Sequence, residues 1–337
     1  MTHSDGRGGA APRVGTALTG RAEATSRDIR GPARVRDAPA TASSWWRRLL
    51  SLLWADPIAL SALLFLAAVV FVAVAAPVLA PHDPTAQDLL RRLQPPVWAG
   101  GSWTHALGTD ALGRDLLSRM IYGGRISLTI GVVVVLLAGT VGTAVGLLVG
   151  YKGGRLDDVT MRLVDLQTAF PYFLLAVTIM AVVGTGQANL IIVLAVGSWV
   201  VYARFARATM LSMRQSAFIE AARAVGCSDA RIILRHSLPN LASPLVTWAT
   251  LELSRVILAE AGLSFLGLGV QPPNPAWGLM VAEGHSYLSS AWWLSTLPGL
   301  VIALVALSIN LFATWLRAAT DPVQRSRLRV EQVKSSF

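Results

Sequence analysis

Charged residues are scarce in this chain: Asp, Glu, Lys and Arg make up 14% of its 337 residues, against about 25% in an average soluble domain. Hydrophobic residues make up 53%. A water-soluble protein of this length needs charged side chains over much of its surface, so the composition excludes that class. It also excludes a largely disordered chain, because disorder goes with low hydrophobicity. An integral membrane protein, with lipid around its outer surface, is the class that remains.

Cysteine and lysine are almost missing. The one cysteine, Cys227, excludes an internal disulfide, and no two of the five histidines have the spacing of metal ligands, so no metal site is predicted. Lys152 and Lys334, the only lysines, do not complete the GxxxxGK[ST] sequence of a phosphate-binding loop. No cluster of His, Asp and Ser indicates a catalytic site. We therefore expect no enzyme activity and no bound cofactor, and an energy source in another chain or in an ion gradient.

Long apolar runs are what the sequence has instead. A helix needs about 20 apolar residues to cross a bilayer, and six segments meet this requirement: 58–80, 126–150, 166–183, 190–206, 245–268 and 294–316. Because these runs are continuous and do not alternate with a period of two, a β-barrel is excluded. The predicted fold is an all-α integral membrane protein with six transmembrane helices.

The basic residues predict the orientation of these helices. With the N-terminus in the cytoplasm, the inner segments hold 22 of the 29 Lys and Arg residues and the outer segments hold five. Basic residues gather in cytoplasmic loops, so both termini are predicted to be cytoplasmic. The net charge of +10 then reflects membrane topology. We expect a lipid bilayer around the chain and no nucleic-acid partner.

Four parts follow from this topology. Residues 1–48 are predicted to form a disordered, Arg-rich cytoplasmic tail, because they have no apolar pattern. Residues 49–125 hold the first transmembrane helix and an extracytoplasmic segment. Residues 126–316 form the core transmembrane domain, which includes the loop 217–239, and residues 317–337 form a cytoplasmic C-terminal tail.

The long inner loop 217–239 has the pattern of two short helices. Four small or apolar residues recur at the spacing of one helical face: Phe218, Ala221, Ala222 and Val225. Glu220 and Arg223, on the other face, are spaced to pair. Gly226 is placed to end this helix and Pro239 to end the next one. The loop either presents its small-residue face to another protein or lies on the lipid headgroups.

Three charges fall inside the fifth span: Glu252, Arg255 and Glu260. Each costs about 2.5–3.5 kcal/mol at the centre of a membrane helix on insertion scales. Glu252 and Arg255 lie three residues apart, so they form either a structural ion pair or part of the translocation path or gate. Glu260 has no partner on the same helix and is therefore the stronger candidate for the path. Unchanged uptake in Glu260→Gln would contradict that role.

The inner loop resembles the EAA loop of ATP-binding-cassette (ABC) import permeases. The residues that carry this resemblance are Glu220, Ala221, Ala222, Gly226, Leu238 and Pro239. With His236 three residues before the proline, the loop resembles that of the peptide and nickel branch of the family. Three further stretches are similar to that branch: 105–115 (HALGTDALGRD), 257–269 (ILAEAGLSFLGLG) and 271–278 (QPPNPAWG). The resemblance covers about residues 56–322.

The resemblance implies the second (C-type) transmembrane subunit of a peptide importer, with a type I ABC importer permease fold, in the bacterial cytoplasmic membrane. The six loop residues would then form the coupling helix that docks onto a cytosolic ATPase. The implied partners are a homologous second permease, one or two cytosolic ATP-binding subunits that use ATP and Mg, and an extracytoplasmic substrate-binding protein.

The resemblance leaves the substrate open, because relatives carry di- and oligopeptides, nickel, glutathione and other small solutes. An ion-driven secondary transporter is the alternative from a different class. Such transporters show internal repeats and broken central helices, and no repeat is visible in this sequence.

Overall fold

The computed structural model describes residues 50–320. Within this part the regular secondary structure is helical, apart from one isolated antiparallel bridge between Thr109 and Asp115. The predicted all-α class is therefore confirmed for the described residues. The predicted tail 1–48 and most of the predicted tail 317–337 lie outside them.

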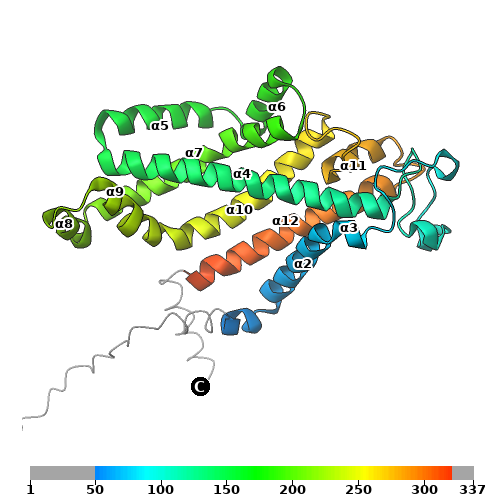
Figure 1. Cartoon of the computed structure of the whole chain (residues 1–337), viewed down its shortest axis with the longest axis horizontal. Helices are drawn as coiled ribbons and strands as arrows, with labels where there is room; N and C mark the ends of the chain where they lie inside the picture. Colours follow the sequence, from blue (N-terminus) through cyan, green and yellow to red (C-terminus); the bar gives the residue numbers. More distant parts are fainter. Residues whose placement is uncertain (1–49, 321–337) are drawn as a thin grey trace, which may run out of the picture. The chain divides into compact units, whose positions relative to one another are not determined.

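The helices follow one another along the chain without a sheet between them (Figure 1). The long or medium helices are α2 (Pro57–Val74), α4 (Leu116–Lys152), α5 (Gly154–Thr168), α6 (Tyr172–Val183), α7 (Gln187–Arg214), α10 (Leu238–Phe265), α11 (Trp277–His285) and α12 (Trp293–Thr320). The short ones are α3 (Ala76–Leu79), η1 (Leu89–Arg91), η2 (Val97–Ala99), η3 (Trp103–His105), α8 (Ala217–Ala224), α9 (Asp229–Arg231) and η4 (Ile232–Ser237).

Five of the six predicted spans are continuous helices that are long and apolar enough to cross a membrane. Helix α4 begins ten residues before the predicted start at 126, because Asp115 caps it by accepting a hydrogen bond from the backbone N–H of Ser118 at 2.8 Å. Arg119 in this first turn, which the apolar pattern had placed outside the helix, pairs with Asp110 and Glu283.

The third predicted span, 166–183, is not a straight helix. Helices α5 and α6 meet there at a bend of 88°, the geometry of a broken span or of a re-entrant loop. Pro171 stands at the break, where its ring disfavours helical geometry for the residue before it. Gln167 donates to the carbonyl of Val196 at 2.7 Å and accepts from the indole of Trp199 at 3.0 Å. These bonds hold the end of α5 against α7.

Helices α4 and α7 lie side by side along much of their length (Figure 1). Glycines at every fourth position of α4 make the contact: Gly142, Gly146 and Gly150. A Cβ on Gly146 would lie 2.3 Å from the carbonyl oxygen of Ala203, and one on Gly142 would lie 2.3 Å from that of Trp199. Only glycine allows two membrane helices to approach this closely.

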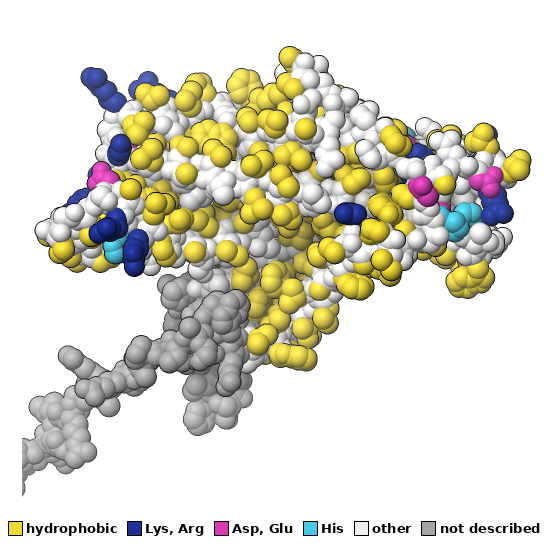
Figure 2. Space-filling view, in the orientation of Figure 1, with side chains coloured by type: hydrophobic (Ala, Val, Ile, Leu, Met, Phe, Trp, Pro, Cys, Tyr) yellow, Lys and Arg dark blue, Asp and Glu magenta, His cyan; other side chains and the backbone are white. Residues whose placement is uncertain are grey.

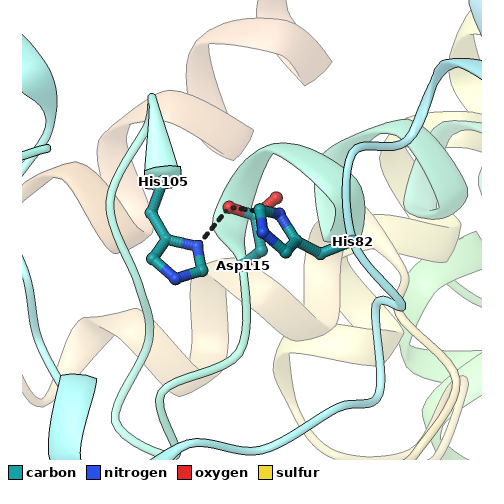
Figure 3. A group of neighbouring side chains, drawn as sticks. All are labelled: His82, His105 and Asp115. Atoms are coloured by element: carbon teal, nitrogen blue, oxygen red, sulfur yellow. Dashed lines mark hydrogen bonds and ion pairs between the residues drawn. The ribbon is translucent and has the colours of Figure 1, made fainter. Parts of the chain in front are cut away.

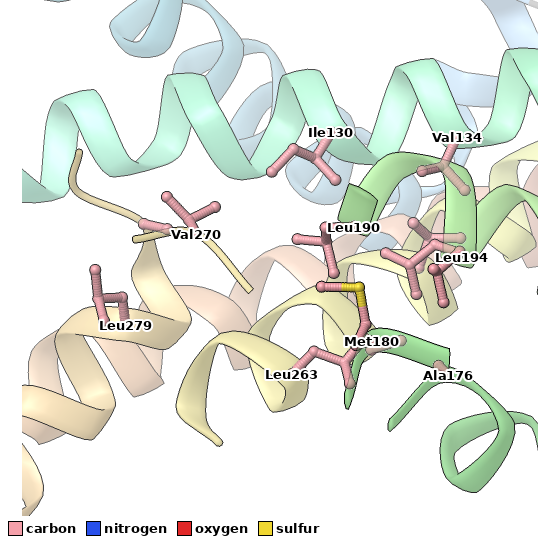
Figure 4. Packing of buried hydrophobic residues seen from close by; sticks show 13 residues of the cluster. Ile130, Val134, Ala176, Met180, Leu190, Leu194, Leu263, Val270 and Leu279 are labelled. Atoms are coloured by element: carbon pink, nitrogen blue, oxygen red, sulfur yellow. The ribbon is translucent and has the colours of Figure 1, made fainter. Parts of the chain in front are cut away.

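A buried apolar cluster fills the space between α4, α6, α7, α10 and the segment around α11 (Figure 4). Its central members are fully buried, among them Ile130, Met180, Leu190 and Leu263. Large apolar side chains also cover the outside of the spans. In the face that Figure 2 shows, charged side chains gather mainly at the two ends of the helices, with an apolar band between them. This distribution is what a surrounding bilayer requires.

The close α4–α7 contact yields a first prediction. Gly146→Ala should destabilise the full-length chain by about 1–3 kcal/mol, because its methyl group overlaps the backbone of α7. The readout is the apparent melting temperature of the protein purified in detergent. Gly139→Ala is the control, since a Cβ there meets the Tyr202 ring at an ordinary 3.5 Å. Equal melting temperatures for the two variants would contradict the contact.

Candidate functional site

The inner loop folds as a short helix that ends in a glycine turn. Helix α8 covers Ala217–Ala224, and Gly226 follows with a φ of 82°. Gly226 N–H donates to the carbonyl of Arg223 at 2.9 Å, and Cys227 N–H donates to that of Ala222 at 3.0 Å. The predicted helix and its glycine end are confirmed, since this left-handed turn is the geometry in which glycine ends helices.

One side of α8 packs against the rest of the protein, and the other side is exposed. Ile219 is fully buried in an apolar cluster with Leu147, Met210, Ile232 and Leu241, which come from α4, α7, η4 and α10. Phe218 and Val225 of the predicted small-residue face stay exposed, Val225 by 84%, and Ala221 between them is exposed too. Ala222, the fourth residue of that face, is half-buried, so the exposed part of the face consists of the other three residues.

Two details of the predicted loop are wrong. Glu220 and Arg223 form no ion pair in the described structure; the guanidinium of Arg223 lies over the ring of Tyr151 instead, 4.9 Å from its centroid. Pro239 does not end the second helix, because α9, the π-helix η4 and α10 run on through it. In the wider turn of η4, the N–H of Leu238 donates a hydrogen bond to the carbonyl of Ile233, five residues earlier. The chain therefore stays helical up to the proline.

Tyr151 at the end of α4 is a site residue that the sequence did not reveal. Its hydroxyl donates to Asp229 at 2.8 Å and accepts from Arg223 Nε at 3.3 Å, while its carbonyl accepts from Arg214 at 3.3 Å. Tyr151 thus joins the end of α4 to α8 and α9. Its position at a span end agrees with the interfacial preference of tyrosine, but nothing in the sequence indicated its partners.

The charges of the fifth span lie on α10 and have different surroundings. Glu252 is buried and pairs with Arg255, with Arg255 Nη1 and Glu252 Oε2 3.6 Å apart. The Arg255 side chain is 46% exposed and lies over the ring of Tyr172, 4.4 Å from its centroid. The predicted pairing of these two charges is therefore confirmed. The contact of Arg255 with Tyr172 joins α10 to the first residue of α6, immediately after the break between α5 and α6.

Glu260 is fully buried and does not reach the surface of this chain. Its carboxylate accepts a hydrogen bond from Ser264, four residues further along α10, at 2.8 Å. The expectation that Glu260 has no same-helix partner is therefore wrong, because a serine hydroxyl takes the place that a charged group would fill. Its predicted role in the path remains a prediction.

The end of the helices opposite α8 is held by a buried ionic network that the sequence also did not reveal. Arg114 Nε donates to Asp110 at 2.6 Å, and Arg119 also donates to Asp110. Both arginines reach Glu283 of α11, at 3.2 and 2.7 Å. The network fixes the outer segment before α4 against the segment between α10 and α12. Glu283 lies more than 160 residues further along the chain, so no local pattern pointed to it.

Two family models match the chain. One, described as a binding-protein-dependent transport system inner membrane component, matches residues 142–326. The other, described as the N-terminal TM domain of oligopeptide transport permease C, matches residues 44–96.

Relatives of known name are similar over most of their length. The di/tripeptide transport system permease protein DppC of Pseudomonas aeruginosa is 45% identical over 78% of this chain and 88% of its own. The dipeptide transport system permease protein DppC of Haemophilus influenzae is 40% identical over 78% and 90%. The glutathione transport system permease protein GsiD of Pectobacterium atrosepticum is 39% identical over 84% and 91%.

Among solved structures, the inward-facing MetNI methionine ABC transporter is similar in fold, with a TM-score of 0.50 and 21% identity over 61% of this chain and 98% of that one. Membrane-crossing helices in this arrangement, with an exposed helical loop at one end, define the transmembrane permease subunit of an ABC importer. The chain belongs to the family of binding-protein-dependent transport system inner membrane components, in its peptide-permease branch.

The Tyr151 contacts yield a second prediction. Tyr151→Phe removes the hydroxyl that bonds Asp229 and Arg223, so the loop 217–231 should open more easily by about 1–3 kcal/mol. Amide hydrogen exchange in that loop of the full-length chain should become about fivefold faster or more. Tyr122→Phe on the same helix is the control, since the Tyr122 hydroxyl makes no hydrogen bond within residues 50–320. Equal exchange in both variants would refute the role.

Proposed function

We propose that this chain is the permease subunit of an ATP-driven importer of di- or oligopeptides in the bacterial cytoplasmic membrane. The partners in this proposal are a second, homologous permease, one or two cytosolic ATP-binding subunits and an extracytoplasmic substrate-binding protein. ATP and Mg are held by the partner ATPases, and this chain binds no cofactor for the transport cycle. The peptide substrate is favoured by the names of the two DppC relatives; a relative named for glutathione, itself a short peptide, fits the same class.

The observation that carries the proposal is that α8 is attached to the protein on one side and exposed on the other. Ile219 and the Tyr151–Arg223 contact fix α8 to α4, α7 and α10, whereas Ala221 and Val225 face outward. A partner that covers this face and moves would pull on the ends of three membrane helices. The coupling residues in this proposal are Glu220, Ala221, Ala222, Gly226, Leu238 and Pro239.

The continuity of the chain from α9 into α10 gives such a movement a direct route into the membrane. Helix α10 carries Arg255, which lies on Tyr172 beside the break of the third span. Residues 169–171 at this break are exposed. Irregular backbone at membrane depth is tolerated only where protein covers it or where it lines an aqueous cavity. We therefore place the transport path, shared with the second permease, along the break and Arg255. This replaces the path through Glu260 that the sequence favoured, because Glu260 is fully buried in this chain.

The coupling surface is tested by a bulky substitution that leaves the chain's own packing intact. Ala221→Trp, with an exposed side chain on α8, should prevent co-purification of the ATP-binding subunits and abolish ATP-dependent dipeptide uptake into proteoliposomes. Glu220→Lys, also exposed, should weaken both.

Ala86→Trp, exposed in the outer segment, is the matched control and should retain the ATP-binding subunits. Normal co-purification and uptake with Ala221→Trp would overturn the coupling role. Uptake that follows an ion gradient without ATP would instead favour the secondary transporter.

The path is tested by comparing two charges of α10. Arg255→Gln should lower the rate of dipeptide uptake roughly tenfold, the effect of about 1.4 kcal/mol on the barrier, because it removes the exposed cation beside the break. Glu260→Gln should leave the rate within about twofold, since the buried amide can still accept the Ser264 hydrogen bond. A strong loss in Glu260→Gln and none in Arg255→Gln would reverse the assignment.

A further inference from the structure

Two histidines and an aspartate from different parts of the outer segment meet at one point (Figure 3). His82 follows the end of α3, His105 is the last residue of η3, and Asp115 caps the N-terminus of α4. Both rings lie beside the carboxylate of Asp115 (Figure 3), and the ring centroids are 4.7 Å apart. The sequence did not predict this group, because His82 lies 23 positions before His105 and only the fold brings the two together.

The distances between the possible ligand atoms suit a metal ion. His105 Nδ1 lies 2.9 Å from Asp115 Oδ1, and His82 Nδ1 lies 3.8 Å from the same oxygen. All three residues offer a ligand atom within 4.8 Å of one another. Around a tetrahedral Zn²⁺ with bonds of about 2.0–2.2 Å, neighbouring ligands are about 3.3–3.6 Å apart. The two distances to Asp115 lie on either side of this range, so small side-chain adjustments would complete the geometry.

The carboxylate is already oriented for such a role. Asp115 Oδ2 accepts hydrogen bonds from the backbone N–H of Ser118 at 2.8 Å and from its hydroxyl at 2.7 Å. The Ser118 hydroxyl in turn accepts from the backbone N–H of His82 at 3.0 Å. These bonds hold Oδ2, while Oδ1 faces the histidines and is hydrogen-bonded to His105 Nδ1 at 2.9 Å. A metal ion bound to both atoms would replace that hydrogen bond. Outer hydrogen bonds of this kind orient ligands at metal sites.

A helix cap alone does not explain the group. Capping α4 requires only Asp115 and Ser118, whereas His82 Nδ1 is buried and makes no hydrogen bond within the described residues. A buried polar atom without a partner is costly, and coordination would satisfy it. His105 and Asp115 are buried, while the His82 side chain is 35% exposed and gives an ion a route from the outside.

We propose that His82, His105 and Asp115 form a binding site for a divalent transition-metal ion on the extracytoplasmic side. Two imidazoles and one carboxylate are a ligand set that suits Zn²⁺, with water in the fourth position, and they do not suit Mg²⁺ or Ca²⁺, which prefer oxygen ligands. The ion would fasten the segment after the first span to the start of α4. It would thereby stabilise the outer segment that a substrate-binding protein would meet.

The test is direct binding of Zn²⁺ to the purified full-length chain after treatment with a chelator and removal of any affinity tag. Competition with a chromophoric chelator should give one tight site per chain, unaffected by millimolar Mg²⁺. Co²⁺ should bind at the same site with the intense visible absorption of tetrahedral coordination. His82→Gln and His105→Gln should each weaken Zn²⁺ binding at least about tenfold, whereas His236→Gln and His285→Gln, outside the group, should not.

The melting temperature without metal, compared with that of the unaltered chain, shows whether each variant still folds. His82→Gln should match the unaltered chain there, because the His82 side chain makes no hydrogen bond within residues 50–320 that the substitution could break. Added Zn²⁺ should raise the melting temperature of the unaltered chain and not that of the double variant His82→Gln/His105→Gln. Zn²⁺ binding of equal affinity and stoichiometry in the double variant, or no tight site in the unaltered chain, would overturn the proposal.

Discussion

Helices α4 and α7 approach until their backbones touch, and much of the remaining structure depends on that contact. Gly142, Gly146 and Gly150 leave no room for side chains between the helices. In lipid no hydrophobic force drives such association, so close packing has to supply it. The contact brings the end of α4 beside the end of α7, where Leu147 and Met210 form the apolar cluster that buries Ile219 of the loop 217–239. A wider helix pair would leave Ile219 without this seat.

Two kinds of interaction hold the loop at this end of the helices. Apolar burial of Ile219 fixes α8 in place, and the Tyr151 hydroxyl joins it to Arg223 and Asp229. The free face keeps Ala221 and Val225 outward. Because α10 continues from η4 without a stop at Pro239, the same loop is mechanically linked to Arg255 within the membrane. At the other end, two groups of polar side chains hold the outer segment to α4 and α11. One is the ionic network of Arg114, Arg119, Asp110 and Glu283, and the other is the neighbouring group of His82, His105 and Asp115.

Much of the fold and part of the site could be predicted from the sequence. The apolar runs marked the positions of the spans because a bilayer demands continuous hydrophobicity over a fixed length. The break at Pro171 was not predicted, since a kinked span has the same composition as a straight one. In the loop, the glycine end at Gly226 was predictable from local geometry. The burial of Ile219 rather than Phe218 was not, because both are apolar and only the neighbouring helices distinguish them.

The sequence by itself determined the class: a membrane protein with helical spans, and a loop whose residues mark an ABC import permease. These follow from composition and from residues close together in the chain, where spacing alone carries the information. Only the tertiary structure decided which partners the polar groups take. Glu283 reaches Arg119 across more than 160 residues, Tyr151 meets Asp229, and His82 meets His105. Such contacts depend on how the helices pack, and packing is a property of the whole chain rather than of any local pattern.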